Sequence, residues 1–349
     1  MKGRPVASKA RKAEVHSLPW DSFQRWILAA DSVLLVSHVF PEADSLGSEL
    51  SLALHLKEQG KSVRICNPTP ALPPCRFLED MAVRERISVE TGVPELTGVD
   101  LVIILDVCDW DHMGALGAAL RESDVPRVCL DHHSPRAPFT PVDLIDPLAS
   151  STGEIVYNYL RSVDAPISPQ IATAIYASVV FDTGCFRLRN ADDETILLAA
   201  DLIRRGASHG KVCRHLFENE SYGRLELLRM ALGSLVTECD GRLAWTVISE
   251  GMFERTGTSF SDAEGILDQL VMIEDLEIGV LFRDWEEGGV KVTFRSKGRV
   301  DVSDIARHLG GGGRRTAAGV LLPYPLREAL ESVLPRLRQE LEEGRREAV

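Results

Sequence analysis

Aspartate, glutamate and histidine side chains recur at a few points in the first half of the sequence. The residues that could act together are His38, Glu42, Asp44, Asp106, Asp131, His132, His133 and Asp182. Carboxylates and imidazoles without thiolates suit Mn²⁺, Mg²⁺ or Fe²⁺ better than a structural zinc ion. Two such ions about 4 Å apart can clamp a phosphoryl group and generate hydroxide from water. The pattern therefore predicts a centre for two-metal hydrolysis of a phosphoester.

Each of these residues also has an ordinary structural explanation when it is taken alone. Asp44 could cap the helix that follows it. Asp106 or Asp182 could be a turn residue, and a lone His38 could be a hydrogen-bonded structural histidine. The recurrence of a carboxylate or an imidazole at one strand end after another favours the metal centre.

The elements that must position these residues follow from the hydrophobic pattern. Strands are predicted at 33–37, 61–66, 101–105 and 127–130, and helices at about 46–59, 152–161 and 168–181. Strands interleaved with helices predict an α/β fold with a mostly parallel sheet and helices on both faces. Ligands bind beyond the carboxyl ends of such strands, where His38, Asp106 and Asp131 stand. The helix after Asp44 would add backbone N–H donors for phosphate.

Asp131-His132-His133 directly follows one of these apolar runs. If the strand continued through it, the two imidazoles would point to opposite faces. One imidazole would then be free to bind metal and the other to reach a substrate.

The second half of the chain repeats the alternation on a smaller scale. Strands are predicted near 243–249, 277–282, 290–294 and 320–322, with helices from about 261, at 302–309 and from 326. We therefore predict a disordered basic tail over 1–17, a first domain over 18–205, a helical linker over 206–235, and a second, smaller α/β domain over 236–345.

Composition limits the class of protein. A length of 349 residues suits two domains, and a net charge of -13 disfavours a protein that grips long duplex DNA. Short RNA or a small nucleotide stays possible, because a few local cations suffice. No apolar run reaches the roughly 18 residues that span a bilayer. The seven cysteines form no C-x-x-C pair, which indicates reduced thiols, and we expect a cytoplasmic protein without membrane contact.

These motifs together resemble the DHH phosphoesterases. The carriers are the stretch from His38 to Ser48 (His-x-x-Pro-acid-x-Asp-x-x-Gly-Ser), the lone Asp106, Asp131-His132-His133, Ser150 to Glu154, and Asp182-Thr183-Gly184. The second half is similar to the DHH-associated C-terminal domain, through Phe294-Arg295-Ser296 and the glycine-rich stretch from Gly311 to Gly319. Within the family the sequence resembles the nanoRNase group, which acts on oligoribonucleotides and on 3′-phosphoadenosine 5′-phosphate (pAp).

The resemblance implies a set of roles in the first domain. One metal would be held by His38, Glu42, Asp106 and Asp182, and the second by Asp44, Asp106, His132 and Asp182. His133 would contact the scissile phosphate, and Asp131 would orient His132 through its second nitrogen. A hydroxide bridging the two ions would attack the phosphoester. Mn²⁺ is the favoured ion, with Mg²⁺ or Fe²⁺ as alternatives.

The resemblance also assigns substrate binding to the second domain. The residues concerned are Arg295, Ser296, Gly311, Gly312, Gly313 and Arg314. Consecutive glycines let the backbone approach phosphate closely and can form an anion nest.

Two positions depart from the family pattern. Glu42 stands where the family usually has aspartate, and its extra methylene moves the carboxylate by roughly 1.5 Å. Arg314 stands where the family usually has histidine; arginine can bind phosphate but cannot act as an acid or base near neutral pH.

Several alternatives stay open. A cyclic-dinucleotide (c-di-AMP or pApA) phosphodiesterase uses a similar core, and a regulator that binds nucleotide without turnover would fit the two departures. Family II pyrophosphatases share the first domain, but the glycine-rich stretch argues against them. A homodimer is possible, as in related two-domain proteins.

Overall fold

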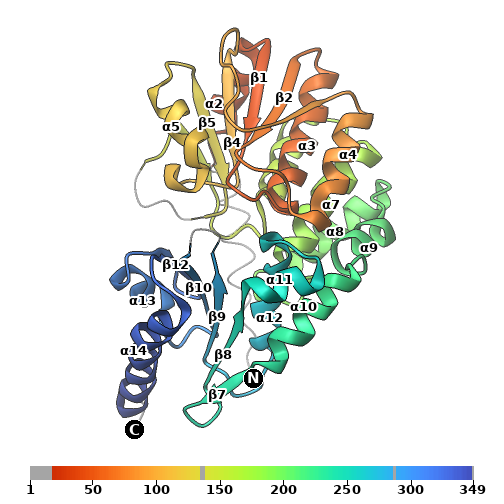
Figure 1. Cartoon of the computed structure of the whole chain (residues 1–349). Helices are drawn as coiled ribbons and strands as arrows, with labels where there is room; N and C mark the ends of the chain where they lie inside the picture. Colours follow the sequence, from red (N-terminus) through yellow and green to blue (C-terminus); the bar gives the residue numbers. More distant parts are fainter. Residues whose placement is uncertain (1–17, 134–137, 286–287, 348–349) are drawn as a thin grey trace. The chain divides into compact units, whose positions relative to one another are not determined.

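The computed structural model describes residues 18–133, 138–285 and 288–347, and for 343–347 the backbone alone. The predicted tail over 1–17 lies outside these residues. The chain separates into two compact units, with the division between Asn219 and Glu220. This point falls between α9 (His209–Phe217) and α10 (Tyr222–Gly233), and the linker predicted over 206–235 covers both helices (Figure 1).

The first unit is built on a six-stranded sheet in the order β3-β2-β1-β4-β5-β6. All neighbouring strands are parallel; Val33, for example, pairs with Val63 on one side and Leu101 on the other. The strands are β1 (Ser32–Val36), β2 (Ser62–Asn67), β3 (Ser88–Thr91), β4 (Leu101–Leu105), β5 (Arg127–Asp131) and β6 (Val142–Ile145). The predicted α/β class is confirmed.

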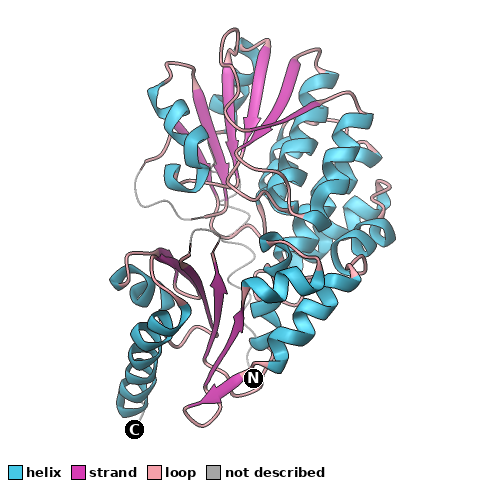
Figure 2. Ribbon diagram, in the orientation of Figure 1, coloured by secondary structure: helices cyan, strands magenta, loops and turns pink. Residues whose placement is uncertain are grey.

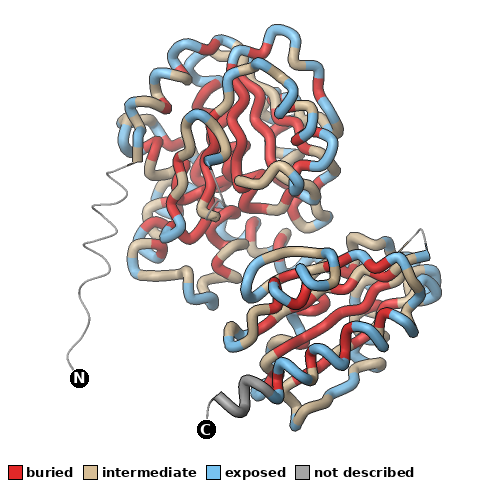
Figure 3. Tube along the Cα trace, turned by 90° about the vertical axis from the view of Figure 1, so that its left-hand side faces the viewer, coloured by how far each residue is buried: buried red, intermediate tan, exposed pale blue. Residues whose placement is uncertain are grey.

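Helices cover both faces of this sheet (Figure 2). They are α2 (Trp20–Ala29), α3 (Ala43–Glu58), α4 (Arg76–Arg84), α5 (Gly114–Glu122), α6 (Thr152–Ser162), α7 (Pro169–Asp182), α8 (Asp193–Arg204) and α9, with 3₁₀ turns η1 (Pro73–Cys75) and η2 (Trp110–Met113). Leu35 packs in the core that contains α3, α6 and α7, whereas Leu34 and Val36 pack in the core that contains α5. The central strand β4 (Leu-Val-Ile-Ile-Leu) is apolar throughout because both of its faces are buried (Figure 3).

The strand order places the candidate site. From β1 the chain proceeds outward to β2 and β3, then returns to β4 on the other side of β1 and continues to β5 and β6. The loops after β1 and β4 therefore diverge, and open α/β sheets bind ligands at the carboxyl ends of the strands at such a point. Close packing of α3 against α7 supports the helices that carry Asp44 and Asp182. A Cβ on Gly47 would lie 2.4 Å from the carbonyl oxygen of Ala174, so glycine is required there.

The second unit is built on a mixed six-stranded sheet in the order β11-β12-β10-β9-β8-β7. Only β8 and β9 are parallel neighbours in the described part of this sheet. The strands are β7 (Val236–Glu238), β8 (Leu243–Ile248), β9 (Ile278–Asp284), β10 (Val290–Ser296), β11 (Gly312–Arg314) and β12 (Ala317–Leu322). The helices are α10, α11 (Glu250–Thr256), α12 (Ile266–Leu270), α13 (Val302–His308) and α14 (Leu326–Glu347), with the 3₁₀ turn η3 (Phe260–Ala263).

Two apolar cores stabilise this unit, one on each face of the sheet. Ile305 of α13 and Val333 of α14 pack in one core, while Leu227 of α10 and Leu267 of α12 pack in the other. α10 thus contributes to the core of the second unit. The helix predicted from about residue 261 is divided into η3 and α12, because Gly265 between them adopts a left-handed backbone with φ 78°.

The short strands β3, β6, β7 and β11 were not predicted. Each has three or four residues, and β3 at the sheet edge has one apolar side chain (Ser88-Val89-Glu90-Thr91). Such runs carry too little hydrophobic signal to be told from loops. In the described part of the chain, no helix is long and apolar enough to cross a membrane.

Candidate metal centre

The predicted acidic and imidazole residues of the first unit meet at the carboxyl ends of β1, β4 and β5. His38 and Asp106 lie in the loops that follow β1 and β4, and Asp131 is the last residue of β5. Asp44 lies in the first turn of α3, and Asp182 is the last residue of α7. These residues form three groups, and within each group the potential ligand atoms lie within 4.8 Å of one another. The groups are Asp106, Asp131, His132 and His133; His38, Glu42 and Asp106; and Asp44, His132 and Asp182.

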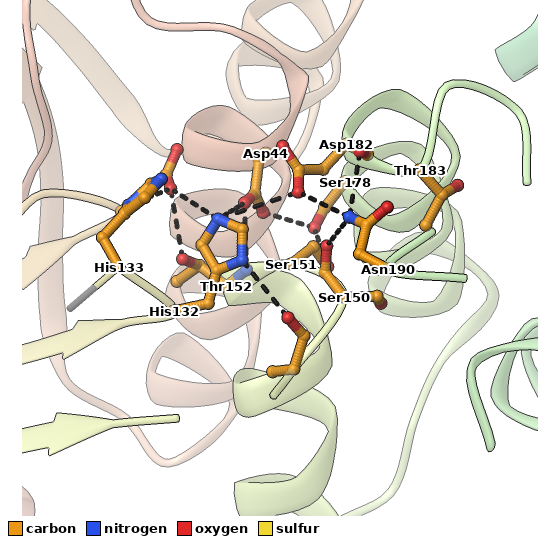
Figure 4. A network of polar contacts seen from close by, with 12 residues as sticks. Asp44, His132, His133, Ser150, Ser151, Thr152, Ser178, Asp182, Thr183 and Asn190 are labelled. Atoms are coloured by element: carbon orange, nitrogen blue, oxygen red, sulfur yellow. Dashed lines mark hydrogen bonds and ion pairs between the residues drawn. The ribbon is translucent and has the colours of Figure 1, made fainter. Parts of the chain in front are cut away.

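His132 is the centre of one group. Its Nε2 is buried and has no hydrogen-bond partner among the described residues. It lies 3.6 Å from Asp44 Oδ2, 3.8 Å from Asp106 Oδ1 and 3.7 Å from Asp182 Oδ2 (Figure 4). These separations are too long for hydrogen bonds. They suit ligand atoms that converge on one shared cation, because metal–ligand distances of about 2.1 Å place neighbouring ligands roughly 3 Å or more apart.

His38 forms the second group with Glu42 and Asp106. Its Nε2 lies 3.4 Å from Asp106 Oδ2 and 2.9 Å from the hydroxyl of Ser45, which donates to that same carboxylate oxygen at 2.9 Å. Glu42 is the N-cap residue of α3, and its side chain makes no capping hydrogen bond. A carboxylate oxygen of Glu42 lies within 4.8 Å of the ligand atoms of His38 and Asp106.

The three histidines share one feature of orientation. Nδ1 of His38 donates to the carbonyl of Val39 at 2.8 Å, and Nδ1 of His132 lies 3.3 Å from the carbonyl of Ala149. Nδ1 of His133 lies 2.6 Å from Asp131 Oδ1. In His38 and His132, a proton held on Nδ1 leaves the Nε2 lone pair for a metal ion.

This geometry corrects two expectations about Asp131-His132-His133. Asp131 contacts His133 through both the backbone N–H (3.0 Å) and Nδ1, so it orients His133 rather than His132. The two imidazoles do not point to opposite faces, since their ring centroids lie 4.3 Å apart. The reason is that β5 ends at Asp131, so the alternation of a strand no longer applies to the residues after it.

Asp44 is held from the side by a second helix. Both of its carboxylate oxygens accept backbone N–H groups at the start of α6, from Thr152 at 2.9 Å and Gly153 at 3.1 Å. The hydroxyl of Ser178 donates to Asp44 Oδ1 at 2.6 Å (Figure 4). The start of a helix stabilises negative charge, so α6 compensates a carboxylate that is completely buried. The N–H donors near Asp44 therefore come from α6, and they serve Asp44 itself.

Four polar residues of this network escaped prediction: Ser45, Thr152, Ser178 and Asn190. Thr152 Oγ1 donates to Asp106 Oδ1 at 3.2 Å, and Asn190 Nδ2 lies 3.2 Å from Asp182 Oδ2. Thr152 belongs to the stretch Ser150 to Glu154 that resembles the family, which was a usable signal. Ser178 lies within an apolar helix, and nothing in its local sequence marks it.

Burial and neighbouring charges shift the pKa values of four residues of this group in opposite directions. Burial alone would lower the pKa of His38, but the hydrogen bond and charge of Asp106 outweigh it and raise the pKa to about 9. Burial opposes protonation of His132 as well, yet Asp44, Asp182 and Asp106 raise its pKa to about 9. Burial would raise the pKa of Asp106, but His38, His133 and His132 hold it below its usual range. Burial and the charge of Asp106 raise the pKa of Asp44.

The directions of these pKa shifts show that the buried carboxylates need positive charge beside them. Protonated imidazoles compensate carboxylates that are buried at 0 and 3 % exposure for Asp44 and Asp106. A divalent cation would perform this role better, because it neutralises several carboxylates at once and releases the histidine protons. The unpartnered Nε2 of His132 and the purely oxygen and nitrogen donors fit a divalent ion such as Mn²⁺ or Mg²⁺.

In the second unit the candidate substrate residues cluster around the end of β10 and the edge strand β11. Arg295 is paired with Asp268 at 3.1 Å and is about one-third exposed. The hydroxyl of Ser296 donates to Val300 O at 2.7 Å and accepts from Gly298 N at 3.1 Å, so its hydrogen bonds lie within the turn after β10. Arg314 is exposed on β11.

The glycine run is part of the sheet rather than a free loop. Gly312, Gly313 and Arg314 pair with β12. A Cβ on Gly313, whose φ is 141°, would lie 2.4 Å from Ala318 Cα, so packing against β12 requires glycine there. A Cβ on Gly312 would meet nothing within 4 Å. Gly312 therefore has free space beside its backbone, whereas Gly313 has a structural reason to be glycine.

Comparisons with known proteins indicate the family of the chain. Residues 32–179 match the DHH family, N-terminal domain, and residues 244–343 match the DHHA1 domain. The chain is 30% identical over 313 residues to the bifunctional oligoribonuclease and PAP phosphatase NrnA of Thermus thermophilus, which covers 88% of this chain and 90% of that protein. It is 26% identical over 369 residues to the cyclic-di-AMP phosphodiesterase GdpP of Geobacillus thermodenitrificans, covering 99% of this chain but 52% of that protein.

One solved structure shares the whole fold. An exopolyphosphatase-related protein from Bacteroides fragilis superimposes with a TM-score of 0.82 at 23% identity, over 97% of this chain and 100% of that one. Fold, site and relatives together define a hydrolase of the phosphoesterase class. The chain belongs to the DHH family, and it carries a DHHA1 domain in its second half. The predicted family is thus confirmed.

Proposed function

We propose that this chain hydrolyses short oligoribonucleotides and pAp, and that it depends on two divalent metal ions, Mn²⁺ being the favoured species. The observation that carries the metal requirement is the buried, unpartnered Nε2 of His132, which faces Asp44, Asp106 and Asp182 at 3.6–3.8 Å. Bound ions would lower the pKa of a water molecule and stabilise negative charge on the phosphoryl group.

The chain's own residues would prepare this chemistry. His132, Asp44 and Asp182 would hold one ion, and His38 and Glu42 the other, with Asp106 positioned between the two groups. Donors from Ser45 and Thr152 fix the Asp106 carboxylate, so little reorganisation is needed when an ion binds.

His133 would bind the substrate phosphate. Its Nδ1 is fixed on Asp131 at 2.6 Å, which leaves Nε2 as the contact to a non-bridging phosphate oxygen. The Asp131 carboxylate thus fixes the direction in which the His133 ring presents Nε2.

The substrate class rests on the relative that matches along nearly its whole length. NrnA of Thermus thermophilus shares 90% of its length with this chain, whereas GdpP shares about half. In the second unit, Arg314 and the open backbone at Gly312 would bind a phosphate or sugar group of the substrate. The net charge of -13 is consistent with a small ligand rather than a long duplex.

A substrate panel tests the proposal. The full chain with Mn²⁺, Mg²⁺, Fe²⁺ or EDTA is assayed for hydrolysis of pAp, di- to pentaribonucleotides, pApA and cyclic di-AMP. We expect metal-dependent hydrolysis with kcat/KM highest for dinucleotides or pAp. Preference for cyclic di-AMP would instead support a cyclic-dinucleotide phosphodiesterase. Nucleotide binding without hydrolysis under any metal would contradict the enzyme and support a regulator.

A further inference from the structure

Asn190 lies at the junction of two segments that carry the metal centre. Its Nδ2 donates to Ser150 O at 2.9 Å, to Asp182 O at 3.1 Å and to Asp182 Oδ2 at 3.2 Å. Figure 4 shows the amide between Asp182 and Ser150. One side-chain amide thus contacts both the end of α7 and the residue that precedes the cap of α6.

The orientation of the amide is determined by its surroundings. All three groups around Nδ2 are oxygen acceptors, so the opposite orientation would place Oδ1 against oxygens. Oδ1 itself is buried and accepts no hydrogen bond from a described residue. Leaving a buried acceptor unpaired is unfavourable. Asn190 therefore acts here as a hydrogen-bond donor through Nδ2, while Oδ1 accepts no hydrogen bond from a described residue.

A hydrogen-bond donor beside the Asp182 carboxylate offsets an unfavourable position for negative charge. It is the last residue of α7, where the partial negative charge of the helix end disfavours a carboxylate. It is also the more exposed carboxylate around His132, with 24% of its side chain accessible against 0% for Asp44 and 2% for Asp106. Asp44 and Asp106 are held by donors from α3, α6 and α7, whereas Asp182 is approached by Asn190 from the loop beyond it.

The second acceptor connects Asn190 to the other carboxylates. Ser150 begins the segment in which Thr152 donates its backbone N–H to Asp44 and its hydroxyl to Asp106. Holding Ser150 O and Asp182 on one amide therefore sets the distance between the Asp182 carboxylate and the carboxylates that α6 orients.

We propose that Asn190 is a positioning residue of the metal centre, which fixes the Asp182 carboxylate relative to Asp44, Asp106 and His132 so that one divalent ion binds tightly. This inference rests on the proposed function. Asn190 does not touch substrate or ion; it acts through Asp182. Loss of such an outer partner typically weakens metal affinity or activity by about 10–100-fold.

The test compares two substitutions of different shape in the full chain. Asn190→Ala removes both the volume and the donor, and Asn190→Leu keeps the branched shape but has no donor. Mn²⁺ binding is measured by calorimetry, and the Mn²⁺ concentration for half-maximal hydrolysis of a diribonucleotide is measured in parallel. We expect both variants to need about 10–100-fold more Mn²⁺, with KM for the substrate at saturating Mn²⁺ within about threefold of wild type.

A matched variant in the same loop controls for general loosening. Arg187 donates from Nε to Gly184 O at 2.7 Å, so Arg187→Ala removes a hydrogen bond of the same loop and should leave the Mn²⁺ requirement unchanged. Wild-type Mn²⁺ affinity in both Asn190 variants would overturn the inference. Recovery of that affinity in Asn190→Leu alone would overturn it too, because it would show that packing rather than the donor matters.

The inference and the proposed function can fail separately. If the wild-type chain neither binds Mn²⁺ nor gains activity from it, the proposed function fails and the inference fails with it. If the wild-type chain shows both properties and the Asn190 variants match it, only the inference fails.

Discussion

The two units hold their functional residues in opposite ways. In the first unit, Asp44 and Asp106 are buried and accept hydrogen bonds from backbone and hydroxyl donors. In the second unit, the basic side chains near β10 and β11 are accessible and pair with surface acids; Arg299 pairs with Glu277 while 81% exposed, and Arg315 with Asp301 while 60% exposed.

This difference bears on what each unit can do. Buried carboxylates with fixed donors form a preorganised site, which suits a bound ion. Exposed ion pairs contribute only about 0–1 kcal/mol each, so a substrate phosphate can replace the acidic partner at little cost. We therefore expect substitutions in the first unit to change turnover and metal binding, and those in the second unit to change substrate affinity.

The largest effect is expected from Asp106→Asn. Asp106 belongs to both the His38 group and the group with His132 and His133, so a neutral amide weakens both ion positions. A bound ion supplies several kcal/mol of transition-state stabilisation, which corresponds to a loss of kcat of about a thousandfold or more. Steady-state kinetics at saturating Mn²⁺, with bound Mn²⁺ counted by elemental analysis, measures it.

A nearby surface residue provides the control for this variant. Asp111 is exposed in η2, in the segment that follows the Asp106 loop, and Asp111→Asn should retain wild-type kcat. A thermal unfolding curve for each variant shows that the fold persists. If Asp106→Asn retained more than about a tenth of wild-type kcat, the first unit would not hold the catalytic ions in the way proposed here.

The sequence predicted the first unit's site better than the second's, and the reason is physical. His38, Asp106 and Asp131 each directly follow an apolar run, so local pattern and the rule of strand ends locate them together. The contacts of Ser178 and Asn190 depend on how α6 and α7 pack, which no local pattern encodes. The resemblance paired Asp131 with His132, but the Asp131 carboxylate contacts His133, and His132 Nδ1 lies beside the carbonyl of Ala149. The expectation that the two imidazoles point to opposite faces was wrong because the strand ends at Asp131.

The glycine run shows the limit in the second unit. The sequence Gly311-Gly312-Gly313 suggests a flexible anion-binding loop, yet Gly312 and Gly313 are part of an edge strand. Pairing with β12 is a contact between two segments, and three glycines carry no β propensity from which it could be read. The α/β class of both units was nevertheless predictable, because their longer strands are apolar runs or alternate with the pleat.

A smaller effect, on substrate affinity, is expected from Arg314→Ala. A hydrogen bond to a charged group contributes about 1.5–3 kcal/mol, so KM for a short ribonucleotide should rise by about 10–100-fold while kcat stays within a few-fold. Arg314→His restores the usual family residue, and because imidazole loses its charge near pH 6.5, KM should then rise between pH 6 and pH 8. Initial rates over a substrate range at both pH values measure these constants.

Arg299→Ala is the matched control, since it removes an exposed arginine of the same unit that is already paired with Glu277. It should leave KM within about twofold of wild type. An unchanged KM in Arg314→Ala, or an equal rise in Arg299→Ala, would show that this part of the second unit acts by general charge or not at all.

The smallest effect on activity, and a specific one on stability, is expected from Glu49→Gln. Glu49 of α3 is completely buried beneath the site; its Oε2 accepts from Asn67 at 2.8 Å, and Oε1 has no partner among the described residues. Burial raises the pKa of Glu49 from 4.5 to about 8, and the hydrogen bond from Asn67 offsets this only in part. The folded chain therefore keeps a proton that the unfolded chain loses near pH 4.5.

The sign of the pH dependence follows directly. Between about pH 4.5 and pH 8 the folded state binds more protons at Glu49 than the unfolded state, so the free energy of unfolding falls as pH rises, by about 1.4 kcal/mol per pH unit from this group. Glutamine keeps the uncharged shape and removes this slope. Urea unfolding of metal-free protein at pH 5.5, 7 and 8.5 should thus show a weaker dependence of the unfolding free energy on pH for Glu49→Gln, with kcat at pH 7 unchanged.

The exposed Glu122→Gln, at the end of α5, is the control and should follow the wild-type dependence of the unfolding free energy on pH. Parallel profiles for Glu49→Gln and wild type would mean that the buried carboxyl is already charged at neutral pH. Burial in the first unit would then not change the ionisation of this carboxyl, and the contrast with the exposed charges of the second unit would not hold for Glu49.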